Sequence, residues 1–142
     1  MVNGADNYIP RGIRNNNPGN IKKNDIQWEG LSDEQTDKTF FQFKSSKWGI
    51  RALTKILLTY RHKYGLKNIM SIITRYAPIE ENDTEAYKNF VSQETNFGIL
   101  KELDETIEDY LPVIKAIIKM ENGVQPYNDE TIIEGMVLAW KK

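Results

Sequence analysis

In the segment AIIKMENGVQPYNDE, residues 116 to 130, an apolar helical run that begins near Tyr110 ends in an acid, Glu121. The apolar residues of this run are spaced three and four apart, which predicts one buried helix face: Tyr110, Val113, Ile114, Ile117 and Ile118. Glu121 follows Ile117 by four residues, so it continues this face. Lys115 and Lys119 lie on the opposite, solvated side. Gly123 is typical of a helix end.

The position of Glu121, inward and at a helix C-terminus, favours the protonated form of its carboxyl group. Burial disfavours the charged form, as does the negative end of the helix dipole, so both raise the pKa of Glu121 above its usual value of about 4.3. A carboxylic acid that keeps its proton near neutral pH can protonate a departing glycosidic oxygen. From helix geometry alone two other interpretations stay open: Glu121 is exposed at a frayed end, or it is buried beside an arginine.

Composition excludes several classes of site. The chain has 142 residues, no cysteine and a single histidine, His62. A disulfide framework, a thiolate nucleophile and a multi-histidine zinc site are therefore excluded, and we expect neither a metal nor a cofactor. No apolar run approaches the roughly 20 residues that span a bilayer, so we expect no membrane insertion. Because the N-terminus lacks a signal-peptide pattern, we expect synthesis in the host cytoplasm.

Charge is distributed unevenly along the chain. Residues 45–76 carry seven lysines and arginines and no acid, whereas the net charge of the whole chain is −1. One interpretation is a positive face that binds nucleic acid, and the other is a solvated face balanced by acids elsewhere in the fold. Tyr60 and Tyr64 belong to the buried helix face and do not alternate with the cations, so we expect no nucleic-acid partner.

The N-terminal third predicts an arm, loops and a small sheet. We expect residues 1–10 to form a flexible arm and RGIRNNNPGN to be loop, because turn formers are dense there. Three short strand-like pieces follow, separated by turn residues, and predict a three-stranded antiparallel sheet: Asn20 to Lys22, Ile26 to Trp28 and Lys38 to Phe43.

From Ser46 onward the pattern has helical periodicity. It predicts about five helices. The first runs from Ser46 to a stop at Gly65, and the second runs from about Lys67 to Tyr76. The third is capped by Asn82, with Ala86, Phe90 and Val91 inward, the fourth begins near Asp104 and is broken or restarted at Pro112, and the fifth covers Asp129 to Trp140 with Asn128 as its cap. In the last, we expect Ile132, Ile133, Met136, Val137 and Trp140 to be buried. The predicted fold is mainly α with one small sheet.

Several strings in the chain support a family resemblance. RGIRNNNPGNIKK, WEGL, FFQF, WGIRALTKILLTY, RYAPIEENDTEAYKNFV and ENGVQPY resemble phage and prophage virion proteins and lysozyme-like peptidoglycan hydrolases. KMENG also resembles the helix end of lysozyme-like domains, where a catalytic glutamate precedes a glycine. In this chain the sheet segments come before that helix, as in a circular permutation. The resemblance implies a single α+β lysozyme-like domain over residues 11–142.

The resemblance also implies a site, in which Glu121 lies beside the asparagine-rich loop as general acid. The amides expected to bind N-acetyl groups and hydroxyls are those of Asn15, Asn16, Asn17 and Asn20. Trp28 is expected to stack on a sugar, and Gly123 is expected to leave room for the substrate. Asp129 and Tyr127 are two further catalytic candidates. Glu29, Asp37 and Thr36 are alternatives for the second catalytic group. The acids Glu80, Glu81 and Asp83 are expected to cap a helix start.

The function implied is cleavage of the MurNAc–GlcNAc β-1,4 bond, by a muramidase or a lytic transglycosylase. The expected partner is peptidoglycan in the periplasm or cell wall, reached from a virion or released at lysis. The alternative is a non-enzymatic virion component that binds cell wall or other virion proteins on the same scaffold.

Overall fold

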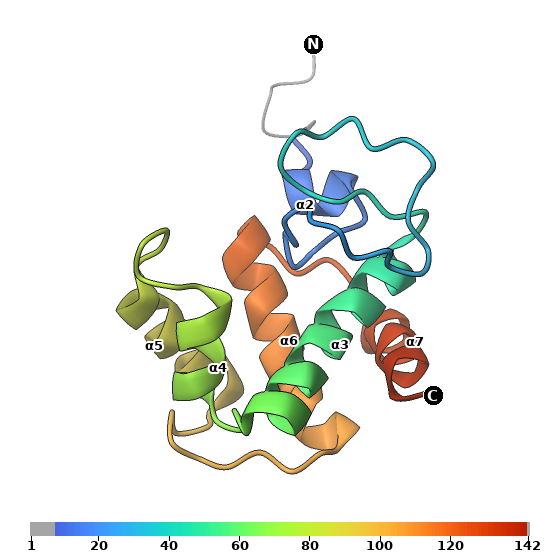
Figure 1. Cartoon of the computed structure of the whole chain (residues 1–142). Helices are drawn as coiled ribbons and strands as arrows, with labels where there is room; N and C mark the ends of the chain where they lie inside the picture. Colours follow the sequence, from blue (N-terminus) through green and yellow to red (C-terminus); the bar gives the residue numbers. More distant parts are fainter. Residues whose placement is uncertain (1–7, 142) are drawn as a thin grey trace.

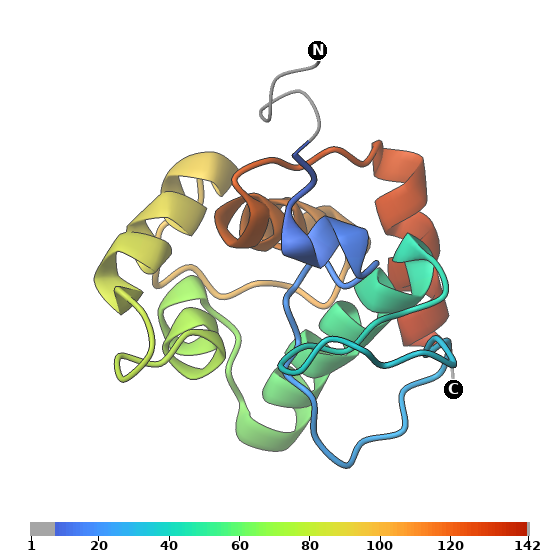
Figure 2. The ribbon, with the colours of Figure 1, turned by 90° about the horizontal axis from the view of Figure 1, so that it is seen from above.

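The computed structural model describes residues 8–141, and within that range the chain forms six α-helices (Figure 1). In chain order they are α2 (Arg11–Arg14), α3 (Ser46–Tyr64), α4 (Ile69–Tyr76), α5 (Thr84–Thr95), α6 (Ile107–Asn122) and α7 (Asp129–Trp140). Helix α6 lies between the α4–α5 pair and the α3–α7 pair (Figures 1 and 2). The loops of residues 15–45 cover one end of these helices. Most of the predicted N-terminal arm, residues 1–7, lies outside the described range.

Helix α6 confirms the periodicity argument, and α3 confirms it in part, because the predicted burial of Tyr64 is wrong: this side chain, in the last turn of α3, is 43% exposed. Leu53 and Leu57 of α3 are fully buried, and Gly65 ends the helix in the left-handed conformation with φ of 67°. The predicted apolar face of α6 is also fully buried: Tyr110, Val113, Ile114, Ile117 and Ile118. Burial of these two faces against one core places α6 at the centre of the molecule.

The predicted break at Pro112 is wrong. Helix α6 runs without interruption from Ile107, and Thr106 caps its start by accepting a hydrogen bond from the Asp109 amide. Proline removes one helical hydrogen bond, the one that the Glu108 carbonyl would accept. Because Glu108 is exposed, water can satisfy that carbonyl. The helix therefore continues through the proline and carries its apolar face to Glu121.

The cap of α5 is shifted by one residue from the prediction. Asp83, not Asn82, accepts the hydrogen bond from the Ala86 amide. The inward face also differs from the prediction: it contains Tyr87 and Val91, which are four residues apart, whereas Ala86 is exposed and Phe90 is half-buried. The Tyr87 side chain is therefore buried, and its hydroxyl group reaches Glu121.

Helix α7 has the predicted bounds and the predicted cap, since Asn128 accepts a hydrogen bond from the Thr131 amide. Its buried side differs in part, because Val137 is exposed whereas Gly135 is buried. A Cβ atom on Gly135 would lie 2.8 Å from Cβ of Ile50 in α3. The glycine therefore allows α7 to pack closely on α3.

The predicted three-stranded sheet is wrong. Residues 8–141 contain no β-strand and only two isolated antiparallel bridges, Lys22 with Phe40 and Leu31 with Phe43. The β part of the predicted α+β class is therefore wrong, whereas the mainly α class is confirmed. The described part of the chain is helices and loops.

Side chains occupy the backbone groups that a sheet would need. The Asn17 amide oxygen accepts from the Ile21 N–H at 3.0 Å, and its amide nitrogen donates to the Phe41 carbonyl at 2.9 Å, so its side chain takes two groups that could bond each other in a ladder. The Gln35 amide nitrogen donates to the carbonyl of Gln42 at 2.6 Å, and its amide oxygen accepts from the backbone N–H of Gln42 at 3.0 Å. Such local side-chain bonds compete with a strand ladder. They hold residues 17–43 in a fixed loop conformation without a sheet.

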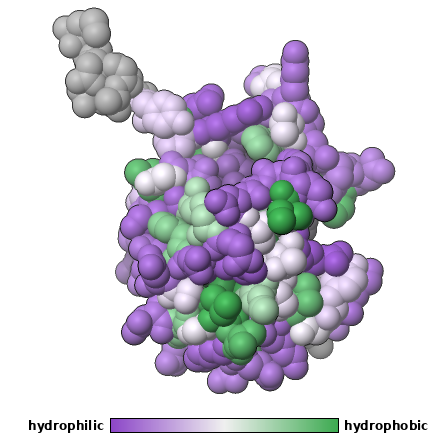
Figure 3. Space-filling model, turned by 90° about the vertical axis from the view of Figure 1, so that its left-hand side faces the viewer, coloured by the Kyte–Doolittle hydropathy of each residue, from purple (hydrophilic) through white to green (hydrophobic). Residues whose placement is uncertain are grey.

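The surface shown in Figure 3 is mainly hydrophilic, with hydrophobic side chains in small separate patches. None of the helices in the described range has the length and hydrophobicity that crossing a bilayer requires.

Candidate active site

Glu121 lies in the last turn of α6, and its side chain lines an open cleft of about 430 Å³. Gly123 ends the helix with φ of 77° and has no atom within 4 Å of the position of a Cβ. The cleft lies between the loop of residues 19–24 and the helices α3, α4 and α6. Its lining residues are Gly19, Asn20, Ile21, Lys22, Asn24, Phe40, Ile56, Tyr60, Tyr76, Glu81, Asn82 and Glu121.

Two neutral groups hold the carboxyl group of Glu121. The Asn20 amide nitrogen donates to Oε1 at 3.0 Å, and the Tyr87 hydroxyl donates to Oε2 at 2.8 Å. Asn20 has the left-handed φ of 51°, a conformation that asparagine adopts more readily than most residues. The loop, α5 and α6 therefore meet at one carboxyl group.

Burial raises the pKa of Glu121, while the hydrogen bonds from Asn20 and Tyr87 partly oppose this rise. Burial also raises the pKa of the Tyr87 hydroxyl well above its usual value, and the adjacent Glu121 raises it further. Tyr87 is therefore a neutral phenol that donates its proton in the hydrogen bond. The carboxyl group keeps its proton to a higher pH than an exposed glutamate does.

The residues beside Glu121 fix the loop to the end of α6. The Asn122 amide nitrogen donates to the Pro18 carbonyl at 2.8 Å, and the Tyr76 hydroxyl donates to the Gly19 carbonyl. A Cβ on the buried Gly12 would lie 2.5 Å from the Asn122 side-chain oxygen, so only glycine allows this approach of α2 to α6. These contacts set the position of Asn20 relative to Glu121.

Comparison with known proteins identifies a phage relative. No family model matches the chain. The chain is 48% identical over 132 residues to Protein P5 of Pseudoalteromonas phage PM2, and the match covers 91% of this chain and 81% of that protein. The chain belongs to the Protein P5 family. The phage relationship predicted from the motifs is thereby confirmed, whereas the name Protein P5 states no activity.

In this member of the Protein P5 family, only one of the four predicted asparagines reaches the cleft. Asn20 binds Glu121, as described above. Asn15 donates to Oδ2 of Asp37 at 2.9 Å, Asn16 donates to the Phe43 carbonyl at 3.1 Å, and the Asn17 side chain is fully buried against backbone groups. Their amide groups hold the loop instead of lining the cleft.

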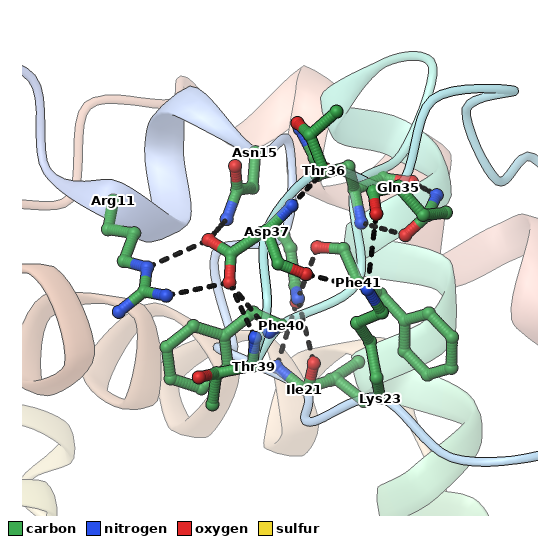
Figure 4. Close-up of polar contacts among 12 residues, drawn as sticks. Arg11, Asn15, Ile21, Lys23, Gln35, Thr36, Asp37, Thr39, Phe40 and Phe41 are labelled. Carbon is green, nitrogen blue, oxygen red and sulfur yellow. Dashed lines mark hydrogen bonds and ion pairs between the residues drawn. The ribbon is translucent and has the colours of Figure 1, made fainter.

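Asp37, an alternative for the second catalytic group, is committed to a separate cluster (Figure 4). The Arg11 guanidinium donates to both of its carboxylate oxygens, at 2.8 and 2.7 Å. The backbone amides of Thr39 and Phe40 donate as well, each at 2.9 Å. The bonds from Arg11, with those from these amides and Asn15, hold the pKa of Asp37 well below its usual range. Asp37 is therefore ionised and has no proton to donate.

The two other catalytic candidates do not line the Glu121 cleft. Asp129, at the start of α7, lies in a separate hollow of about 570 Å³, where Lys115 binds it at 2.8 Å. Tyr127 packs against the core, and burial raises its pKa to about 12. The Tyr127 hydroxyl is buried and has no hydrogen-bond partner within residues 8–141. The geometry thus separates both residues from Glu121.

The remaining predicted residues also lie away from the carboxyl group. Trp28 packs against the core, and its buried indole nitrogen has no partner in the described range. Glu29 forms an exposed ion pair with Arg51 at 3.5 Å, and the Thr36 hydroxyl donates to Gln42 at 3.2 Å. Within residues 8–141 no cluster of three acids or histidines has metal-binding geometry.

Sequence reasoning missed Tyr87 and most of the residues that line the Glu121 cleft. Tyr87 binds the carboxyl group, and Lys22 and Glu81 line the cleft as an ion pair. The signal for Tyr87 is its helical spacing, since it lies four residues before Val91, which was expected to face inward. Lys22 and Glu81 are 59 residues apart in the chain, and no local pattern connects them.

Proposed function

We propose that the chain cleaves the glycan strands of peptidoglycan, with Glu121 as the general acid. One observation carries the proposal: a carboxyl group whose pKa is raised by burial lines an open cleft. A general acid must hold its proton at working pH and reach its substrate. The raised pKa of Glu121 favours the first condition, and its place in the cleft lining supports the second.

In the proposed reaction, Glu121 transfers its proton to the oxygen of the β-1,4 bond as the bond between that oxygen and C1 of the muramyl sugar breaks. Asn20 and Tyr87 already donate to the carboxyl oxygens, so they stabilise the carboxylate that forms. That carboxylate then takes a proton from the attacking nucleophile. Water gives hydrolysis, whereas the 6-hydroxyl of the muramyl sugar gives a 1,6-anhydro product.

The lining of the cleft suits a carbohydrate. Phe40, Tyr60 and Tyr76 supply aromatic surface, and Asn24 and Asn82 supply amide groups. A site that combines apolar walls with a few polar groups is typical of small-molecule recognition. We propose that the chain acts on the cell wall of the phage host, either from the virion or at lysis.

The direct test is clearing of bacterial sacculi stripped of outer membrane. We expect the purified protein to clear them and Glu121→Gln to lower the rate by roughly 100-fold or more. The matched control is Glu94→Gln, which makes the same change beside the other hollow, where Glu94 pairs with Lys119 at 3.1 Å. Circular dichroism checks that both variants fold. An unchanged rate in Glu121→Gln removes Glu121 from the mechanism.

Mass spectrometry of the released fragments distinguishes the two chemistries. A reducing muramyl sugar at the new end identifies a muramidase, and a 1,6-anhydro muramyl sugar identifies a lytic transglycosylase. Fragments of neither kind, with peptide bonds cut instead, contradict the proposal.

A second candidate is a non-enzymatic virion or wall-binding protein. Both oxygens of Glu121 already have hydrogen-bond partners inside the protein, which also suits a purely structural acid. In that case the protein sediments with sacculi without clearing them. Glu121→Gln then leaves this binding unchanged.

A further inference from the structure

Lys22 and Glu81 form an ion pair at the Glu121 cleft. Lys22 follows Asn20 in the loop that holds the carboxyl group, and Glu81 lies in the turn between α4 and α5. Both residues line the cleft, and their side chains are 56% and 52% exposed. A ligand in the cleft can therefore reach both charges.

An exposed ion pair of this kind contributes little to stability, because water screens it and two long side chains must be held still. The two charges can separate at low cost when a ligand offers each of them a new partner. A ligand that carries both a carboxylate and an ammonium group can replace the pair, one charge for each side chain.

We propose that Lys22 and Glu81 bind the peptide stem of the muramyl residue and make the cleft selective for peptide-bearing glycan. This inference rests on the proposed function. Stem peptides carry carboxylates, and a diamino acid in the stem carries a free ammonium group. Lys22 pairs with a carboxylate and Glu81 pairs with the ammonium group. A neutral glycan such as chitin has neither charge.

Arg75 lies next to the cleft wall without lining the cleft. Its guanidinium lies 3.9 Å from the ring centroid of Tyr64 and 5.4 Å from that of Tyr60, and Tyr60 lines the cleft. The two rings hold the guanidinium beside the wall, outside the lining residues, so the inference rests on Lys22 and Glu81 alone.

Three ligands separate the contributions of the two side chains. A disaccharide with its peptide stem carries both charges. The same disaccharide after removal of the stem by an amidase keeps only the lactyl carboxylate, and a chitin disaccharide is neutral. Calorimetry with Glu121→Gln, which leaves the glycan uncut, measures the binding of each.

We expect the stem-bearing ligand to bind best and chitin to bind least. Adding Lys22→Gln weakens binding of both carboxylate-bearing ligands by roughly two- to fivefold, and adding Glu81→Gln weakens only the stem-bearing one by a similar factor. Lys119→Gln, which breaks an ion pair outside the cleft, is the control and preserves all three affinities.

Equal affinity of the three ligands, or an equal loss for all three in both variants, overturns the inference. An equal loss means that the pair only shapes the cleft. If none of the three ligands binds, the inference is overturned as well. Failure of the proposed function is a separate result: wild type then clears no sacculi, whatever the order of the three affinities.

Discussion

Glu121 and Asp37 are two acids held by the same loop region under opposite conditions. Each accepts a hydrogen bond from a loop asparagine, Asn20 for Glu121 and Asn15 for Asp37. The second side-chain partner differs, since Glu121 has the neutral Tyr87 and Asp37 has the cation Arg11. Burial therefore raises the pKa of Glu121, whereas the bonds from Arg11 lower the pKa of Asp37.

This difference shows what makes an acid available for proton transfer. Hydrogen bonds alone stabilise a carboxylate and lower its pKa. A cation strengthens that effect, while burial among neutral groups outweighs it. Asp37 is thus a structural anion that fixes the loop, whereas Glu121 lines the cleft and keeps its proton to a higher pH than an exposed glutamate.

The largest effect on stability is expected at Asp37. Asp37→Asn removes the charge that Arg11 and the amides of Thr39 and Phe40 bind, so we expect the free energy of unfolding at pH 7 to fall by about 1–3 kcal/mol. Because the folded pKa is depressed, this stabilisation is present above the ordinary value of 3.8 and is lost as the pH falls further. Denaturant unfolding of wild type and variant from pH 7 to pH 3 measures it. If the difference in free energy of unfolding between wild type and variant grows as the pH falls, the pKa of Asp37 is not depressed in the folded state.

A smaller effect is expected at Tyr87. Tyr87→Phe removes one hydrogen bond, which costs about 0.5–1.5 kcal/mol of stability. Because that bond lowers the pKa of Glu121, its loss raises the pKa further, and the alkaline limb of the clearing rate moves to higher pH.

Tyr110→Phe is the matched control for Tyr87→Phe. Tyr110 is also a buried tyrosine, and its hydroxyl accepts a hydrogen bond from Arg61 at 3.4 Å, away from Glu121. We expect no movement of the alkaline limb in this variant. A shift to lower pH in Tyr87→Phe shows that the hydroxyl does not stabilise the Glu121 carboxylate.

A small effect of opposite sign is expected at Glu121 itself. Its raised folded pKa makes the wild type most stable below the ordinary value of 4.5, and stability falls as the pH rises through the folded pKa. Glu121→Gln removes that loss, so the variant is slightly more stable than wild type at pH 7 and matches it near pH 4. Thermal unfolding at the two pH values measures the difference. If the stability of Glu121→Gln relative to wild type is lower at pH 7 than at pH 4, the pKa of Glu121 is not raised.

The smallest effect is expected at Asp129. Its ion pair with Lys115 is exposed and lies in the separate hollow, so Asp129→Asn changes the clearing rate by less than about twofold. A loss comparable with that of Glu121→Gln shows that Asp129 acts on the substrate.

The helices were predictable because their signals are local. The apolar face of α6, the glycine stops at Gly65 and Gly123 and the Asn128 cap each depend on residues within a few positions. The same local signals indicated the inward direction of Glu121 and its raised pKa. Tyr87 was missed because Ala86 and Phe90 were assigned to the inward face of α5, although Tyr87 lies four residues before the buried Val91.

The loop region was not predictable from local patterns. Short apolar pieces suggested strands, but the side chains of Asn17 and Gln35 bind backbone groups of Ile21, Phe41 and Gln42 that a sheet would use. A run of asparagines does not show which amides face the protein and which face a cleft. Only Asn20, with its left-handed backbone, meets Glu121, and that contact joins residues 101 positions apart.

The most direct test of the central claim is a titration of Glu121 by carbon-13 NMR. Protein labelled at the glutamate carboxyl carbon is followed from pH 3 to pH 9, and Glu121→Gln assigns the signal by its disappearance. We predict a midpoint above the ordinary value of 4.5, the direction that burial imposes. A midpoint at or below 4.5 means that Glu121 is ionised like an exposed glutamate, and it contradicts the role of general acid.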